Sequence, residues 1–262
     1  MTPMSAESVW LSGRFVSAER ARVPALSPAV LDGAGAYETL RLVRGEAPLV
    51  ALHAARLATA CLTLGFDRPR TDWARVIREL ARRNGVRAGV ARITLSRDFA
   101  LVSLRPFPRR LARERRQGIG LESVRLQRGA AALKGTSRLP LVLAEGADRC
   151  EVILRGERGA LLETSRANFF AVTASGIETA PSPLVLPGIA RGLVVELARG
   201  LGARVRLRAP RARDLAAFGE AFVTNAVRGV RPVHSIDGVR LRVAPDSLTF
   251  RLQKSLDQRM GL

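Results

Sequence analysis

The segment 105–118 most constrains the fold of this 262-residue chain, because it separates two stretches that are both rich in strand patterns. It carries two prolines and six arginines and shows no periodic apolar face. Domain boundaries commonly fall in segments of this kind, which few contacts cross. We therefore expect an α+β chain with a small N-terminal domain at 1–104, a linker at 105–118 and a larger C-terminal domain at 119–262.

The N-terminal half mixes strand and helix patterns. Alternation of apolar and polar residues, helical spacing and turn residues predict hairpins around Ser12-Gly13 and 44–46, helices at 49–64 and 71–83, and a strand at 90–96. Gly33 and Gly35 precede a strand, whereas the glycines of a dinucleotide-binding fingerprint lie between a strand and a helix. We therefore reject that fingerprint.

The C-terminal half is again β-rich. The pattern predicts strands near 119–124, 151–154, 161–164, 168–172 and 221–224, a helix that begins near Ser137, a helix from 186–192 to about residue 200, and a last helix at 246–256. At the second of these helices, Pro187-Gly188 leaves the first backbone N–H groups without acceptors. Such a helix start attracts phosphate or carboxylate groups.

Charge and composition exclude several classes of protein. The formal net charge is +20, but the arginines run through nearly every segment and aromatic residues make up only 5%, so we expect no nucleic-acid partner. Cys61 and Cys150 lack the spacing of a metal site, which favours a reduced compartment and no metal. No signal peptide and no apolar run of about 20 residues is present in the sequence. We expect a cytoplasmic protein with no membrane partner.

Lys134 is the residue that points most directly to chemistry. The 43 Lys and Arg residues include only two lysines, and the other one, Lys254, lies among polar residues near the end of the chain. Arginine replaces lysine well as a surface charge, but its guanidinium cannot lose a proton and serve as an amine nucleophile or base. Lysine can do so when burial or a neighbouring charge lowers its pKa. The alternative is that two lysine codons escaped a general arginine bias.

Several stretches, read together, resemble fold-type IV pyridoxal-phosphate enzymes, the family of branched-chain and D-amino-acid transaminases and of aminodeoxychorismate lyase. The matching stretches are GAGAYETLR (33–41), HAARL (53–57), LKGTSRLPLVLA (133–144), LLETSRANFF (161–170), LPGIAR (186–191) and FVTNAVRGVRPV (222–233). Each is weak alone, but all six occur in the family's order. The resemblance implies two domains, each a sheet or partial barrel with flanking helices, an active site between them, pyridoxal 5′-phosphate as cofactor, and a homodimer.

The resemblance also assigns roles to residues. Lys134 would be the Schiff-base lysine and proton shuttle, and Glu163 the partner of the pyridine nitrogen. The phosphate would be held by Arg56, by the helix-start amides of Ile189 and Ala190, and by Thr224. Tyr37 and Arg97 would face a small amino substrate. Pyridoxal phosphate needs an amine, an acid near its ring nitrogen and a phosphate cradle, and these residues supply them.

The subclass follows from finer features. Three stretches resemble aminodeoxychorismate lyase, which forms 4-aminobenzoate and pyruvate for folate biosynthesis. They are Ser137-Arg138-Leu139 after the lysine, Thr224-Asn225-Ala226, and residues 230–233 at the end of the last matching stretch. Two features depart from the family: Ala34 replaces the usual acidic residue between the glycines, and the segment at 98–101 is short. We expect a lyase first. The alternatives are a class IV aminotransferase acting on branched-chain or D-amino acids, and a basic nucleic-acid-binding or non-catalytic protein.

Overall fold

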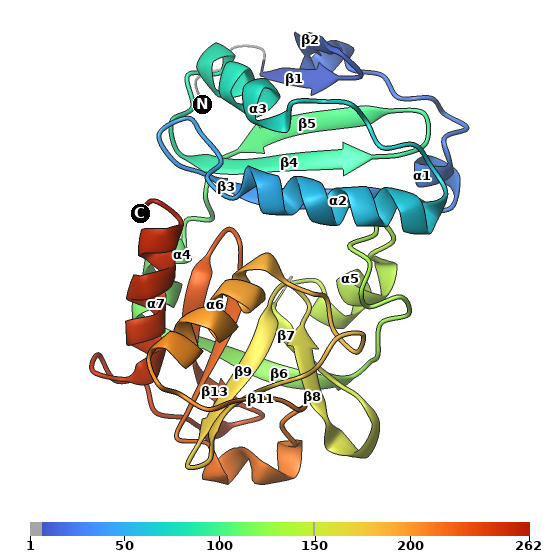
Figure 1. Cartoon of the computed structure of the whole chain (residues 1–262). Helices are drawn as coiled ribbons and strands as arrows, with labels where there is room; N and C mark the ends of the chain where they lie inside the picture. Colours follow the sequence, from blue (N-terminus) through green and yellow to red (C-terminus); the bar gives the residue numbers. More distant parts are fainter. Residues whose placement is uncertain (1–6, 149) are drawn as a thin grey trace. The chain divides into compact units, whose positions relative to one another are not determined.

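The computed structural model describes residues 7–148 and 150–262 (Figure 1). By their contacts these residues form two compact units. Unit 1 contains the chain up to Phe107 together with Leu133–Ser137 and Gly261, and unit 2 contains Pro108–Ala132, Arg138–Met260 and Leu262. The segment that carries Lys134 is thus grouped with unit 1, whereas we expected it in the C-terminal domain. The domain limits at 1–104, 105–118 and 119–262 stay a prediction.

Unit 1 is an antiparallel sheet covered by helices. Its elements are β1 (Ser8–Leu11), β2 (Arg14–Ser17), the 3-10 helix η1 (Ala18–Arg20), α1 (Pro28–Leu31), β3 (Ala36–Leu42), α2 (Val50–Leu64), α3 (Trp73–Arg83), β4 (Gly89–Leu95) and β5 (Ala100–Arg105). The strand order is β2-β1-β5-β4-β3. Leu57 of α2 and Ile77 of α3 pack into one core with Leu40 and Leu42 of β3. Site residues on β3 therefore stand on a rigid edge strand.

Most of the expected elements of unit 1 are confirmed. Ser12 and Gly13 both have positive φ and form the two-residue turn between β1 and β2. Helix α3 begins after Asp72, whose carboxylate accepts the Arg75 N–H and caps the helix. The second expected hairpin is wrong beyond its turn, because the chain after Glu46 enters helix α2 instead of a strand. Strand β5 was not predicted.

Unit 2 contains a partial barrel. Its elements are α4 (Leu111–Gln117), β6 (Ile119–Arg125), α5 (Leu139–Glu145), β7 (Val152–Arg155), the 3-10 helix η2 (Glu157–Gly159), β8 (Leu161–Thr164), β9 (Asn168–Thr173), β10 (Gly176–Thr179), α6 (Ile189–Gly200), β11 (Val205–Leu207), the 3-10 helix η3 (Ala212–Ala217), β12 (Glu220–Asn225), β13 (Gly229–Ile236), β14 (Val239–Arg240) and α7 (Leu248–Arg259). Because β8 pairs with both β7 and β9, strands β9, β12, β13, β6, β7 and β8 close into a ring. Ile153, Phe169, Val223 and Val233 belong to a buried core shared by these strands.

The predicted strands and helices of the C-terminal half are present, with additions. Helix α4 lies inside the segment we expected to be a linker, and its Arg115 pairs with Asp257 of α7. Helix α5 begins one residue later than predicted, with Arg138 rather than Ser137 as its N-cap. Sequence reasoning missed strand β13, and it also missed the short strands β10, β11 and β14. Such strands of two to four residues carry too little alternation to recognise.

Candidate active site

Lys134 is held at the free edge of the unit 1 sheet. The Tyr37 N–H donates to the Lys134 carbonyl at 2.9 Å, and the Thr136 N–H donates to the Gly35 carbonyl at 2.8 Å. Gly135 forms an antiparallel bridge with Ala36 at the start of β3. The segment Leu133–Ser137 therefore extends the sheet by a short stretch, and hydrogen bonds at the Lys134 carbonyl and the Thr136 N–H fix the backbone that follows the lysine.

Glycine is required where this segment meets the sheet. A Cβ at Gly35 would lie 2.8 Å from the Leu95 carbonyl oxygen and 3.0 Å from Thr136 Oγ1. No side chain fits at that separation. The matching GAG stretch thus has a physical role, since its second glycine lets the lysine segment, β3 and the end of β4 approach one another.

The Lys134 side chain lies beside Tyr37. Its Nζ is 4.7 Å from the centroid of the Tyr37 ring, and the Arg92 guanidinium is 3.9 Å from the same ring. Cations at these distances interact favourably with an aromatic ring. The structure thus brings together two of the residues to which the resemblance assigns roles, Tyr37 and Lys134, and adds Arg92 to them.

Glu38, His53 and Arg56 form a buried cluster in unit 1. Arg56 donates from Nε to Glu38 Oε1 and from Nη2 to Oε2, both at 2.7 Å. His53 Nδ1 lies 2.6 Å from Glu38 Oε2. Arg56, predicted to bind phosphate, is therefore oriented by a carboxylate that sequence reasoning missed. Strand β3 supplies the carboxylate and helix α2 supplies both partners.

The charge states of this cluster follow from its environment. Burial raises the pKa of Glu38, but the hydrogen bonds from Arg56 and His53 outweigh this and hold the pKa at about 2. Burial lowers the pKa of His53 despite its hydrogen bond to Glu38, so the ring is neutral and donates through Nδ1. The carboxylate therefore stays ionised and accepts from both partners.

This cluster predicts a loss of stability in acid. Because the pKa of folded Glu38 lies below its ordinary value of 4.5, the carboxylate stabilises the fold fully above pH 4.5 and loses this effect as the pH falls toward 2. Complete loss corresponds to about 3 kcal/mol. The difference in unfolding free energy between the wild type and Glu38→Gln, measured in denaturant at pH 7, 4.5 and 3, is expected to shrink as the pH falls. The exposed Glu46→Gln variant is the control. A difference that does not change with pH contradicts the prediction.

In unit 2, three buried polar side chains lie in one row across neighbouring strands. Glu163 of β8 is opposite Asn168 of β9, and Asn168 is opposite Thr224 of β12. Directly opposed residues present their side chains on the same face of a sheet. A bulge in β8 helps to set this register, because Leu161–Thr164 runs opposite only Ile153–Arg155 of β7. Bulges of this kind redirect side chains beside functional sites.

Glu163 is held in one orientation. Its Oε2 accepts from Asn168 Nδ2 at 3.3 Å and from the Leu186 N–H at 3.2 Å, and its Oε1 accepts from Arg128 at 2.8 Å. Asn168 also donates to the Leu186 carbonyl at 2.9 Å. These contacts connect the glutamate to the chain that leads into helix α6, so two predicted site elements are linked through Asn168.

The start of helix α6 is built for close approach. Gly188 is its N-cap, and a Cβ there would lie 2.0 Å from Asn168 Oδ1, so only glycine fits. The N–H groups of Ile189 and Ala190, in the first turn, have no acceptor within the helix. Thr224 is only 1% exposed, and among the described residues its Oγ1 has no hydrogen-bond partner. An unpartnered buried hydroxyl and a free helix start are features of an anion site.

Two further residues differ from simple expectation. Arg97, predicted to face the substrate, lies in the exposed turn between β4 and β5. Asn225, next to Thr224, uses its side-chain oxygen to accept the N–H groups of Val227 and Arg228 and so shapes the turn after β12. The role of Arg97 stays a prediction, and Asn225 supports the loop.

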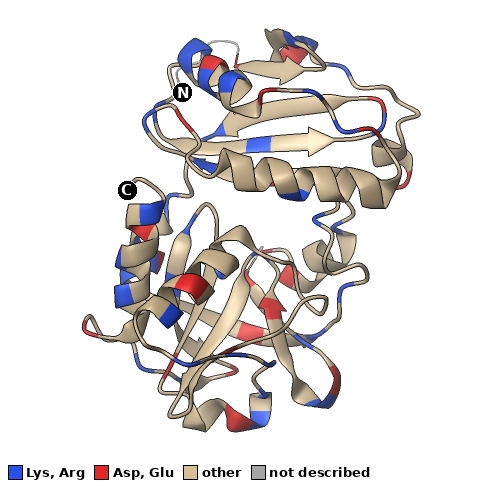
Figure 2. Cartoon of the chain, in the orientation of Figure 1, with Lys and Arg blue, Asp and Glu red and all other residues tan. Residues whose placement is uncertain are grey.

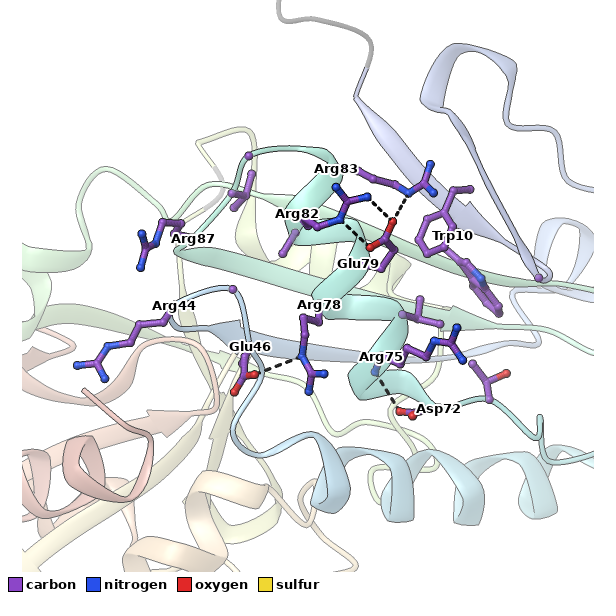
Figure 3. Close-up of a pocket in the computed structure, with 18 of the residues that line it drawn as sticks. Trp10, Arg44, Glu46, Asp72, Arg75, Arg78, Glu79, Arg82, Arg83 and Arg87 are labelled. Atoms are coloured by element: carbon purple, nitrogen blue, oxygen red, sulfur yellow. Dashed lines mark hydrogen bonds and ion pairs between the residues drawn. The ribbon is translucent and has the colours of Figure 1, made fainter.

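A separate groove of ≈ 1190 Å³ runs along α3 in unit 1 (Figure 3). It is lined by exposed arginines, some of which pair with acids: Glu79 with Arg82 and Arg83 at 2.8 Å, and Glu46 with Arg78 at 3.2 Å. None of the predicted site residues is among the described residues that line it. The groove is a solvated, charged face, and the candidate site residues of unit 1 lie outside it.

Basic residues occur on helices, strands and loops of both units (Figure 2). Within the described ranges, no group of three or more His, Cys, Asp or Glu side chains is arranged to hold a metal ion. No helix in the described part of the chain combines the length and the apolar character needed to span a membrane.

Comparison with known proteins places these features in context. The amino-transferase class IV family matches residues 35–236. The putative branched-chain-amino-acid aminotransferase of Methanocaldococcus jannaschii is 26% identical over 276 residues, covering 96% of this chain and 94% of that protein. The branched-chain-amino-acid aminotransferase of Escherichia coli K12 is 25% identical over 291 residues, covering 97% and 93%.

Solved structures agree on the fold. The Escherichia coli branched-chain aminotransferase aligns with a TM-score of 0.87 at 22% identity, covering 98% of this chain and 95% of that one. A PLP-bound hypothetical aminotransferase from Mycobacterium tuberculosis aligns with a TM-score of 0.84 at 23% identity, covering 96% and 98%. The predicted fold-type IV architecture is confirmed.

Proposed function

Because the chain belongs to the amino-transferase class IV family, whose enzymes use pyridoxal 5′-phosphate, we propose that it transfers the amino group of branched-chain amino acids to a 2-oxo acid. The names of its relatives support this donor class, since two relatives that align with nearly the whole chain are called branched-chain-amino-acid aminotransferases. This changes the order of our sequence-based alternatives, because the relatives favour the aminotransferase over the lyase.

The described residues fit the three parts of the cofactor. Lys134 supplies the amine, and its backbone is fixed against β3. Glu163 supplies a buried carboxylate for the ring nitrogen. For the phosphate, unit 2 offers the Ile189 and Ala190 amides and the unpartnered Thr224 hydroxyl, and we propose that Arg56 also binds it. Charge-assisted bonds to phosphate favour an arginine that a carboxylate has already oriented.

Each residue then has a defined task. The bound cofactor supplies an electron sink for the bond broken at the substrate's α-carbon. The Glu163 carboxylate would accept a hydrogen bond from the ring nitrogen and so stabilise a proton on that nitrogen. Lys134 Nζ would take the proton from the substrate's α-carbon and deliver it to the carbon on the other side of the transferred nitrogen, which is general acid–base catalysis. Tyr37 packs beside that amine and limits its motion, and Arg97 binds the substrate carboxylate.

Aminodeoxychorismate lyase is the second candidate. The observation that favours it is the stretch after the lysine, where Ser137-Arg138-Leu139 resembles the lyase pattern. In the structure Arg138 caps helix α5, and its Nη2 donates to the Ser165 carbonyl at 3.2 Å. The cofactor residues serve both reactions, so the substrate decides between them.

Two assays with the purified, cofactor-loaded protein separate these functions. We expect leucine, isoleucine or valine with 2-oxoglutarate to yield glutamate, and aminodeoxychorismate to yield neither 4-aminobenzoate nor pyruvate. D-Alanine as donor tests the D-amino-acid alternative, and Lys134→Ala is the inactive control. Formation of 4-aminobenzoate and pyruvate without glutamate would reverse the assignment in favour of the lyase.

Assembly and other partners stay predictions. The family resemblance leads us to propose a homodimer, and a solution mass of one chain, 28.3 kDa, would contradict it. We propose no nucleic-acid partner, because buried and half-buried arginines of unit 2 serve internal carboxylates, as Arg228 and Arg231 do with Glu114 and Glu151. A cytoplasmic location also remains a prediction.

A further inference from the structure

Arg191 is a buried cation without an acidic partner. It stands in the first turn of α6 and is 8% exposed. Its Nη2 donates to the Ala180 carbonyl at 2.7 Å and its Nε lies 3.4 Å from Thr179 Oγ1, both neutral oxygens. Among the described residues, no carboxylate lies within ion-pair distance of its guanidinium. Burial lowers the pKa of this guanidinium, and the charge of Glu163 acts against that shift.

This position is unfavourable on two counts. A buried charge without a counter-charge costs several kcal/mol in proteins. A cation in the first turn also opposes the positive end of the helix dipole. Arg231, the other buried arginine among the described residues of unit 2, is paired: it lies 2.9 Å from Glu114 and 2.7 Å from Glu151. Arg191 therefore needs a separate explanation.

The nearby acid, Glu163, does not provide the missing counter-charge for Arg191. Glu163 already bonds Arg128 at 2.8 Å, so this glutamate has its own counter-ion. The two arginines and one glutamate leave one excess positive charge near the start of α6. The free N–H groups of the first turn and the unpartnered Thr224 hydroxyl add positive ends of dipoles in the same unit. All of these groups favour an anion.

We propose that Arg191 is a positioning residue that supplies the counter-charge for the cofactor's phosphate at the start of α6. Its hydrogen bonds go to the neutral oxygens of Thr179 and Ala180, so it acts on the phosphate through its electric field. The buried, low-dielectric surroundings strengthen that field. This inference rests on the proposed assignment of the phosphate to Ile189, Ala190 and Thr224.

Cofactor selectivity tests the inference. Pyridoxal lacks the phosphate, so the ratio of its dissociation constant to that of pyridoxal phosphate reports the phosphate contribution. In the apoprotein, Arg191→Gln is expected to weaken pyridoxal phosphate binding about 10- to 30-fold, as for a charge at a partly buried helix terminus. Pyridoxal binding should change less than about threefold, because only the phosphate interaction is removed. Arg191→Lys keeps the charge and should retain the wild-type ratio within about threefold.

Matched variants exclude a purely structural role. Thr179→Val removes a hydrogen-bond acceptor of Arg191 but keeps the charge, so its ratio should equal that of the wild type. Equal weakening of both ligands in Arg191→Gln, no weakening, or a phosphate-specific loss in Thr179→Val would each overturn the inference. If Arg191→Gln does not fold, loss of selectivity in Arg191→Lys overturns it and retention supports it. A wild-type protein that does not distinguish the two ligands would overturn the phosphate assignment itself.

Discussion

Replacing Lys134 with alanine is expected to abolish transamination, with a fall in turnover of at least about 10⁴-fold, because one side chain serves as both the amine and the proton carrier. The structure supports this double role through position, since the Lys134 carbonyl accepts the Tyr37 N–H of β3 and the Lys134 Nζ lies beside the Tyr37 ring. Steady-state assays measure the loss of turnover, and the near-visible absorbance of the protein measures the loss of the cofactor's bond to the lysine.

Lys254→Ala is the matched control for this experiment. Lys254 is the chain's other lysine and lies in α7, away from any predicted site residue in the sequence. Its removal should leave turnover and absorbance unchanged. Activity retained in Lys134→Ala, or lost only in Lys254→Ala, would show that the catalytic amine had been assigned to the wrong residue.

Glu163→Gln is expected to lower turnover by about 10²–10⁴-fold while the cofactor remains bound, the range for general acid–base and electrostatic contributions. A neutral amide cannot hold a proton on the ring nitrogen, so the electron sink weakens. The phosphate contacts lie on other residues and are unchanged. Turnover and cofactor affinity should therefore separate, which a general loss of folding would not produce.

The control for Glu163 is another buried glutamate in unit 2. Glu178 is 4% exposed and pairs with Arg208 at 2.5 Å, much as Glu163 pairs with Arg128. Glu178→Gln also removes a buried carboxylate from an arginine but should leave turnover within about threefold. Equal losses in the two variants would mean that charge balance in the fold, and not the ring nitrogen, explains the effect.

Local sequence signals predicted much of the fold. The Ser12-Gly13 turn was predictable because it is marked by its own two residues, which adopt positive φ. Helices α2, α3 and α6 were predictable because their apolar spacing and the residues at their ends can be recognised in the sequence. Short strands such as β10 were missed because their existence depends on pairing with β9 and β11. The helix inside 105–118 was missed because packing against β13 and α7, and not an apolar stripe, stabilises it.

The residues of the candidate site likewise fall into two groups, those proposed from the sequence and those recognised only in the structure. Lys134 and Glu163 could be proposed from the sequence, the lysine from its rarity and both from the resemblance to a family pattern, and their roles stay predictions. The roles of Asn168, Glu38 and Arg191 were not predicted, because each side chain is held by contacts with residues outside its own sequence motif. Asn168 bonds the Leu186 carbonyl, Glu38 accepts from His53 and Arg56, and Arg191 donates to Thr179. Such partners become visible only when the sheet register brings the segments together.

The central claim, that the cofactor is carried by Lys134, is tested most directly by borohydride reduction of the purified wild-type protein, followed by protease digestion and mass spectrometry. We predict that a single peptide containing Lys134 carries the reduced cofactor and that the protein is yellow before reduction. A label on Lys254, or a wild-type protein that binds no pyridoxal phosphate, would contradict the account.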